Sequence, residues 1–436
     1  MDKLVIDGGD RLKGEVTVSG AKNACLPILA ACLMTDEECL IHGVPELVDI
    51  VRLNKLLGEL GVKVSQDAHD PGTVRVQVQD EVNCQARYDL VRQMRASICV
   101  MGPLVAKRGK ALISQPGGCA IGDRPINLHL HGLQALGAQY ELEVGGNISV
   151  QGHRLQGAEI FLGGPFGSSV LATANVMSAA CLAEGSTIIE SAACEPEIVD
   201  LADLLNKMGA KITGHGSPRI IIEGVKRLGG AEHTVIPDRI EAGTFMIAAA
   251  MTGGEVTIKN CRLDHMLAVV DNLRRIGVTI ERLNGPSSGG DQTVLVHAQG
   301  RFEPVDITTQ PYPGFPTDLQ AQFMALLCLA KGNSVVTDKV FPDRFMHVGE
   351  LGRMGAQLRK QGPAVVISGV KKLVGAPVMA SDLRASAALV LAGLVAEGTT
   401  EVHRVYHIDR GYQRIEEKLN ALGARIQRRP EETDPV

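Results

Sequence analysis

The chain has 436 residues, of which 45% are hydrophobic and 21% charged, and its formal net charge is −5. This length is sufficient for two or three ordinary domains. The negative charge argues against the basic face of a nucleic-acid-binding protein, and no apolar run reaches the length of a membrane-spanning helix. With 49 Gly, no Trp and 3% aromatic residues, the composition predicts an aliphatic core and many tight turns.

The N-terminus, MDKLVIDGGD, has no apolar signal region, and residues 3–19 form a strand-like opening before the first apolar helix. The ten cysteines are scattered and contain no CxxC pair, so a structural zinc site is not expected. Together these features predict a protein of the reducing cytoplasm.

One pattern recurs six times along the chain, at a spacing of roughly 70 residues. A helix ending in a segment of the form LxxLG is followed each time by an alternating, strand-like run. Upstream of this pattern an alanine-rich helix runs into a turn and then a strand, as in residues 178–191 and 387–405. These helices are apolar nearly all round, so they should be buried rather than amphipathic. The glycines that end the pattern are Gly61, Gly137, Gly209, Gly277, Gly355 and Gly423.

This repetition predicts an α/β protein in which each unit buries its helix and places its sheet outside. Three units packed through their helices would form a lobe, and six would form two lobes with pseudo-threefold symmetry. The alternative is a duplicated α/β sandwich without a functional cleft. We expect one lobe from residues 1–21 and 237–428, the other from residues 22–236, and a flexible tail at 429–436.

The segment GGCAIGDRPINLH, residues 117–129, carries a cysteine on a glycine turn close to arginines. Fixed cations lower the pKa of a neighbouring thiol and bind phosphate or carboxylate, so Cys119 with Arg124 and Arg95 indicates a site for an anionic small molecule. Pro125 is typical of a helix start, which would add anion-binding donors. The alternative is that Cys119 is only a small residue in a tight turn.

A second candidate is the polar pair Lys22 and Asn23, which opens an apolar helix beside the first predicted crossing between lobes. Ligands favour such domain interfaces. The alternative is ordinary capping by Asn23 with a solvated Lys22.

Polar groups also precede apolar elements of the other lobe, at equivalent positions of the repeats. Any one of them alone is more typical of a surface or capping group, and Asp318 would cap the following helix. Related by rotation, they would converge on one end of the lobe, where clustered arginines require an anion. They are Asp318, Arg344, Asp382, Arg384, Asp409 and Arg410.

Over its whole length the chain resembles the UDP-N-acetylglucosamine 1-carboxyvinyltransferase family of the EPSP synthase superfamily. The matching motifs are SGAKNA, MRAS, GGCxIGxRPxxLH, EPEIVD, PDRIExGTF, PTDxQAQF, RFMHVxEL, DLRASAALVLAG and YHIDRGY. The resemblance implies a two-lobed inside-out α/β barrel of six βαβαββ units, with the active site between the lobes. It also implies transfer of the enolpyruvyl group of phosphoenolpyruvate to the 3′-hydroxyl of UDP-N-acetylglucosamine, with release of phosphate.

The resemblance assigns roles to individual residues. Cys119 matches the cysteine that meets phosphoenolpyruvate, acts as a proton donor at its methylene carbon or in product release, and is alkylated by fosfomycin. Asp318 matches a candidate general base, and Lys22 and Arg410 are also implied to be catalytic. Asp382 matches a further active-site group. Phosphoenolpyruvate contacts are implied for Lys22, Asn23, Arg124, Arg344, Arg384 and Arg410. UDP-sugar contacts are implied for Arg95, Arg124, Pro125, Ile126, Asn127, Leu128, Ser169, Val170, Asp318 and Val340. No metal, organic cofactor, nucleic acid or membrane partner is implied.

Three positions depart from the family pattern and bear on the UDP-sugar contacts: Asn127 replaces an aspartate, Leu171 a glycine, and Val48 the lysine of some members. Three other interpretations remain open. The chain could act on shikimate 3-phosphate, sense a UDP-sugar without catalysis, or serve as a six-repeat scaffold. The Cys119 loop and the string GGCAIGDRP argue against the first, and the joint presence of Lys22, Cys119, Asp318 and Arg410 argues against the second. Arginines clustered around a thiol argue against the third.

Overall fold

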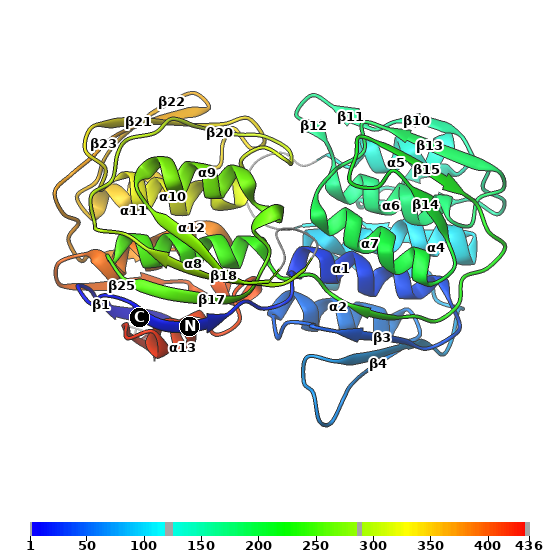
Figure 1. Cartoon of the computed structure of the whole chain (residues 1–436). Helices are drawn as coiled ribbons and strands as arrows, with labels where there is room; N and C mark the ends of the chain where they lie inside the picture. Colours follow the sequence, from blue (N-terminus) through cyan, green and yellow to red (C-terminus); the bar gives the residue numbers. More distant parts are fainter. Residues whose placement is uncertain (1, 118–124, 286–289, 432–436) are drawn as a thin grey trace, which may run out of the picture. The chain divides into compact units, whose positions relative to one another are not determined.

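The computed structural model describes residues 2–117, 125–285 and 290–431 (Figure 1). The chain folds as two compact units. Of these residues, unit 1 comprises 2–19, 237–285 and 290–431, and unit 2 comprises 20–117 and 125–236. The chain passes from unit 1 into unit 2 between residues 19 and 20 and returns between residues 236 and 237.

Six four-stranded sheets of one topology make up the described strands, apart from a small hairpin. In each sheet the first strand is parallel to the second, and the third pairs antiparallel with the second and the fourth. Six copies of one arrangement are what the sequence repeats predict.

The sheets of unit 2, in strand order, are β16 (Glu232–Thr234), β3 (Cys39–His42), β5 (Val74–Val78) and β4 (Val62–Gln66); β6 (Gln85–Ala86), β7 (Lys110–Ser114), β9 (Asn147–Gln151) and β8 (Gln139–Leu142); and β10 (Glu159–Phe161), β13 (Ser186–Glu190), β15 (Arg219–Glu223) and β14 (Lys211–Thr213). The hairpin consists of β11 (Gly163–Gly164) and β12 (Gly167–Ser168). The sheets of unit 1 are β2 (Lys13–Thr17), β17 (Glu255–Cys261), β19 (Gln292–His297) and β18 (Thr279–Asn284); β20 (Ile307–Thr309), β21 (Asn333–Asp338), β23 (Ala364–Ser368) and β22 (Gln357–Gln361); and β24 (Pro377–Met379), β25 (Thr399–His403), β1 (Asp2–Asp7) and β26 (Arg425–Pro430).

Each unit contains inner, largely buried helices and outer helices that precede the last strand of a sheet. The inner helices are α1 (Lys22–Ala31), α4 (Met101–Arg108) and α6 (Val170–Ala180) in unit 2, and α8 (Arg239–Met251), α10 (Gln320–Leu327) and α12 (Leu383–Val395) in unit 1. The outer helices are α2 (Val48–Glu59), α5 (Asn127–Ala135) and α7 (Pro196–Lys207) in unit 2, and α9 (Leu267–Ile276), α11 (His347–Arg353) and α13 (Ile415–Ala421) in unit 1. A short helix, α3 (Tyr88–Val91), completes the set.

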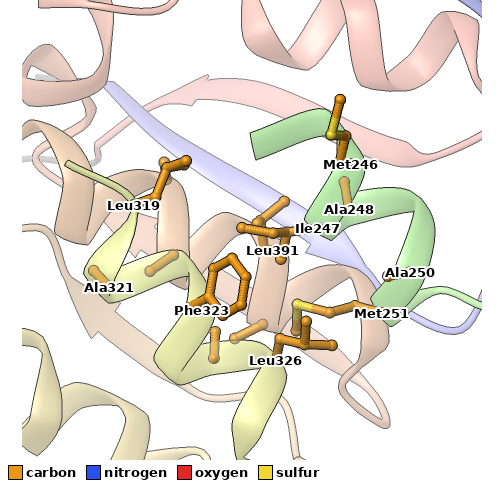
Figure 2. Packing of buried hydrophobic residues seen from close by; sticks show 14 of the residues in the cluster. Met246, Ile247, Ala248, Ala250, Met251, Leu319, Ala321, Phe323, Leu326 and Leu391 are labelled. Carbon is orange, nitrogen blue, oxygen red and sulfur yellow. The ribbon is translucent and has the colours of Figure 1, made fainter. Parts of the chain in front are cut away.

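The inner helices of unit 1 form the centre of its core. Every residue of α8 is buried, and α8, α10 and α12 contact one another. Figure 2 shows Phe323 of α10 beside Ile247 of α8 and Leu391 of α12, and each of these residues is at most 1% exposed. Small alanines let the helices approach closely, while the larger side chains fill the remaining space. The predicted order, buried helices with sheets outside, is confirmed within the unit (Figure 1).

The six repeat glycines have a common backbone conformation. Each follows an outer helix, and all six have positive φ values, from 80° to 105°. Residues with a Cβ rarely adopt this left-handed conformation, so a glycine is needed where the chain turns from the helix into the next strand. The LxxLG pattern was therefore a correct signal of helix ends.

The N-terminal strand completes the sheet at the other end of the sequence. β1 lies between β25 and β26, with Leu4 opposite Val402 and Ile6 opposite Ile426. β26 runs to Pro430, so the tail expected from residue 429 is wrong for its first two residues, and residues 432–436 lie outside the described part. No helix among the described residues is long and apolar enough to span a membrane.

Candidate active site

In unit 1, Asp318 is shared by two buried arginines. It lies in the 3-10 turn η4 (Thr317–Leu319), which leads into α10, and its carboxylate accepts hydrogen bonds from Arg344 Nη1 at 2.8 Å and Arg384 Nη2 at 3.2 Å. The side chains of these arginines are 6% and 2% exposed, whereas that of Asp318 is 28% exposed. The alternative that Asp318 caps the next helix is wrong, because Leu319 is the N-cap residue of α10 and no side chain caps it.

The guanidinium of Arg384 is charged, and its protein partners occupy only some of its hydrogen-bond donors. Burial disfavours the charged form, but the nearby Tyr412 and Asp318 raise the pKa of Arg384 above its ordinary value. Its guanidinium lies over the Tyr412 ring, 5.3 Å from the centroid, and its Nε and Nη1 atoms have no hydrogen-bonding partner of ordinary geometry among the described residues. A buried cation with unused donors is suited to an oxyanion.

Asp382 and Asp338 fix the backbone around this cluster. Asp382 caps α12 by accepting from the backbone N–H of Arg384 at 2.8 Å, and it lies 3.8 Å from Arg344 Nη2. Asp338 is fully buried and accepts from the Thr317 hydroxyl at 2.7 Å and from the backbone N–H of Val340 at 2.9 Å. It therefore ties the turn of Asp318 to the loop of Val340. The sequence analysis missed Asp338, because a single aspartate after a strand carries no motif.

Arg410 belongs to a segment that packs against the helix of Arg384. It is the last residue of the 3-10 turn η5 (Val405–Arg410), and η5 contacts α12. Tyr412 follows two residues later, with its hydroxyl 2.9 Å from the Thr244 hydroxyl and 3.1 Å from Gln322 Nε2. The sequence analysis did not single out Tyr412, although it lies within the YHIDRGY motif.

In unit 2, Lys22 is a buried cation with a carboxylate partner. It opens α1, is 7% exposed, and places Nζ 3.2 Å from Asp49 Oδ2. Asp49 also accepts from Arg52 Nη1 at 3.4 Å. The alternative of a solvated Lys22 and a capping Asn23 is wrong, because Lys22 is buried and Ala21 is the N-cap residue. Asp49 was another residue that the sequence analysis missed.

Arg95 holds together the two ends of the segment that contains Cys119. Its Nη1 donates to the Pro116 carbonyl at 3.3 Å and its Nη2 to the Pro125 carbonyl at 3.5 Å. Cys119 and Arg124 themselves lie outside the described residues. Pro125 does not start the helix: Ile126 is the N-cap residue, and α5 begins at Asn127.

The remaining predicted UDP-sugar residues lie at two helix starts of unit 2. Asn127 is exposed, and Leu128 lies against Gly164 of the hairpin β11–β12. Ser169 caps α6, accepting from the backbone N–H of Ala172 at 3.4 Å, and Val170 opens that helix. Helix starts present free N–H groups, which favours an anionic ligand. Among the described residues, no group of His, Cys, Asp or Glu is arranged to hold a metal ion.

Two buried histidines next to these groups predict a loss of stability in mild acid. Burial, and then the charge of Arg95, lower the pKa of His129 to about 3; burial lowers that of His347 to about 4, against an opposing effect of Asp382. Each unfolded histidine binds a proton below about pH 6.5 while the folded one does not. Their stabilising contribution is therefore present above pH 6.5 and is lost as the pH falls toward 4.

We expect the unfolding free energy to fall between pH 6.5 and 5 by up to ~1.4 kcal/mol per pH unit for each histidine. Denaturant titrations at a series of pH values measure this slope. His347→Gln should flatten it, whereas the matched variant of an exposed histidine, His69→Gln, should leave it unchanged. Equal slopes for His347→Gln and the parent protein would contradict the prediction.

Comparison with known proteins first defines the class. The sequence model of the family EPSP synthase (3-phosphoshikimate 1-carboxyvinyltransferase) matches residues 6–419, and the chain therefore belongs to this family. The enolpyruvyl transferase NikO from Streptomyces tendae has the same fold, with a TM-score of 0.87 at 24% identity over 98% of each chain. EPSP synthase from Acinetobacter baumannii gives 0.76 at 20% identity over 99% of this chain and 100% of that one. The expected two-lobed α/β fold is confirmed.

More similar relatives narrow the class to one kind of transferase. A protein of Methylacidiphilum infernorum is 54% identical over 98% of this chain and 99% of its own, and one of Akkermansia muciniphila is 54% identical over 99% and 100%. Both are named UDP-N-acetylglucosamine 1-carboxyvinyltransferase. The chain is thus a transferase enzyme related to these proteins over nearly its whole length.

Proposed function

We propose that this enzyme transfers the enolpyruvyl group of phosphoenolpyruvate to the 3′-hydroxyl of UDP-N-acetylglucosamine and releases phosphate. The observation that carries the proposal is Asp318, a partly exposed carboxylate held between two buried arginines. It supplies a base for a hydroxyl group beside cations that suit phosphate and carboxylate. The names of relatives 54% identical to the chain favour the UDP-sugar as acceptor.

The proposed reaction is an addition followed by an elimination. Asp318 removes the proton of the sugar 3′-hydroxyl while the hydroxyl oxygen forms a bond to C2 of phosphoenolpyruvate. At the same time C3 gains a proton, for which Cys119 is the proposed donor. The tetrahedral ketal then loses phosphate by cleavage of the C2–O bond, and loss of a proton from C3 restores the double bond. Every atom is accounted for, and the protein supplies positioned charge and proton transfer.

The anionic phosphoenolpyruvate is the proposed ligand of six groups. The UDP-sugar is the proposed ligand of the residues at the two helix starts of unit 2 and of Arg95, Arg124, Asp318 and Val340. Lys22 and Arg384 suit the phosphoenolpyruvate site because both are buried cations paired with a neighbouring carboxylate. The proposed phosphoenolpyruvate ligands are Lys22, Asn23, Arg124, Arg344, Arg384 and Arg410. The product would enter peptidoglycan synthesis in the cytoplasm.

An assay with two acceptors tests the proposal. Phosphate release is measured with phosphoenolpyruvate and either UDP-N-acetylglucosamine or shikimate 3-phosphate, and the product is identified by its mass. We expect turnover when UDP-N-acetylglucosamine is the acceptor and none when shikimate 3-phosphate is the acceptor. Turnover with shikimate 3-phosphate and none with the UDP-sugar would overturn the proposal. Binding of the UDP-sugar without turnover would favour the alternative of a non-catalytic protein that senses a UDP-sugar.

A further inference from the structure

Arg428, far from the cluster of Asp318 in sequence, ties three elements of unit 1 together through one side chain. Its Nη2 and Nη1 atoms donate to the two carboxylate oxygens of Asp409 at 2.7 and 3.0 Å, and its Nε donates to Glu416 at 2.7 Å. Arg428 lies on β26, Asp409 in η5 and Glu416 in α13. Asp409 is the residue directly before Arg410, a proposed phosphoenolpyruvate ligand.

This network differs from an ordinary surface ion pair. Exposed pairs contribute little, but bidentate arginine–carboxylate pairs within networks fix geometry as well as charge. The side chains of Arg428, Asp409 and Glu416 are only 27%, 30% and 13% exposed. The hydrogen bonds to Asp409, opposed by burial, raise the pKa of Arg428 above its ordinary value. All three nitrogens of the guanidinium are engaged, so its orientation is determined.

The segment held in this way carries groups of the candidate active site. η5 is preceded by Arg404, whose φ of 58° is in the left-handed region, and it is followed by Gly411 and Tyr412, whose backbone N–H groups both donate to the Ile408 carbonyl at 3.0 Å. Tyr412 in turn lies under Arg384. The packing of η5 on α12 and the fork of Arg428 on Asp409 therefore restrain the same short segment from two elements.

We propose that Arg428 is a positioning residue: through Asp409 it holds η5 so that Arg410 is oriented toward the anionic substrate. This inference rests on the proposed function, because Arg410 is assigned to phosphoenolpyruvate there. Lysine at position 428 would keep the positive charge but could not form the planar fork. Affinity for phosphoenolpyruvate should then fall, while the chemical step and the sugar site remain intact.

The experiment compares Arg428→Lys with Arg429→Lys, the same change at the next residue of β26. Arg429 is exposed and donates to Gln427 of its own strand. For Arg428→Lys we expect the KM for phosphoenolpyruvate to rise about tenfold. Both kcat and the KM for UDP-N-acetylglucosamine should stay within about twofold of the parent, and Tm should be unchanged. Arg429→Lys should leave all four unchanged. Asp409→Asn should reproduce the effect, and the double variant should add little to either change.

Two kinds of result would overturn the inference. Equal KM values for Arg428→Lys and Arg429→Lys would remove the positioning role, and a joint loss of kcat, both KM values and Tm would show a purely structural one. If the parent protein itself gives no turnover, the proposed function fails, and titration calorimetry with phosphoenolpyruvate alone then tests the inference. Binding that is weakened by Arg428→Lys but not by Arg429→Lys supports it. Any other pattern, including no binding by the parent protein, rejects it.

Discussion

Replacing Asp318 by asparagine should lower kcat by about a thousandfold while the protein still folds. A positioned general base contributes roughly 10²–10⁴-fold to the rate, and an amide of nearly the same shape cannot accept the hydroxyl proton. Asparagine keeps an oxygen that can accept a hydrogen bond from Arg344 or Arg384. The measurement is steady-state kinetics with phosphoenolpyruvate and UDP-N-acetylglucosamine.

The same substitution should also destabilise unit 1, because two buried guanidinium groups lose their shared counter-charge. Breaking a fully buried ion pair costs about 3–5 kcal/mol. Since Asp318 is partly exposed, and Asp382 still lies 3.8 Å from Arg344, we expect a smaller loss of about 1–3 kcal/mol in denaturant unfolding. Asp343→Asn is the matched control, since Asp343 is exposed and directly precedes Arg344 in the sequence. Turnover within tenfold of the parent for Asp318→Asn would exclude it as the base.

The repeats of the fold were predictable from sequence because their signals are local. A glycine that must adopt a left-handed conformation after a helix is written into each repeat, and the six φ values confirm all six helix ends. The inner helices other than α4 were equally visible, since a helix that is apolar all round has to be buried. The placement of β1 between β25 and β26 has no such local signal, because its partners lie some 400 residues away.

The residues of the candidate site also divide into those that the sequence could predict and those that only the structure reveals. Asp318, Arg344 and Arg384 lie in recognisable motifs, and the structure brings them together in unit 1. Asp49 and Asp338 are single carboxylates whose importance arises only from what they contact, Lys22 in one case and the turn of Asp318 in the other. Capping was the weakest inference, because Asn23 was a plausible cap residue by type, yet the chain starts α1 after Ala21.

Treatment with the epoxide fosfomycin should modify Cys119 and leave the other nine cysteines intact. The nucleophile is the thiolate, and burial raises the pKa of Cys99, Cys181, Cys261 and Cys328 to about 12. At pH 7.5 such a thiol is ionised in only ~3 molecules in 10⁵, against roughly one in ten for a free cysteine. Mass spectrometry of the digested protein measures the modified positions.

Two of the other cysteines make this a demanding test. Cys194 is the one of the nine described cysteines that is not buried, and burial followed by the charge of Glu195 raises its pKa. The pKa of Cys39 is lowered by a hydrogen bond from Cys32, but Cys39 has no exposed surface for an epoxide to reach. Cys119→Ala should therefore abolish labelling, and Cys194→Ala should preserve it. Labelling of Cys194 or Cys39 at a comparable rate would mean that exposure or pKa alone selects the thiol, and that no anion-binding site directs the reagent to Cys119.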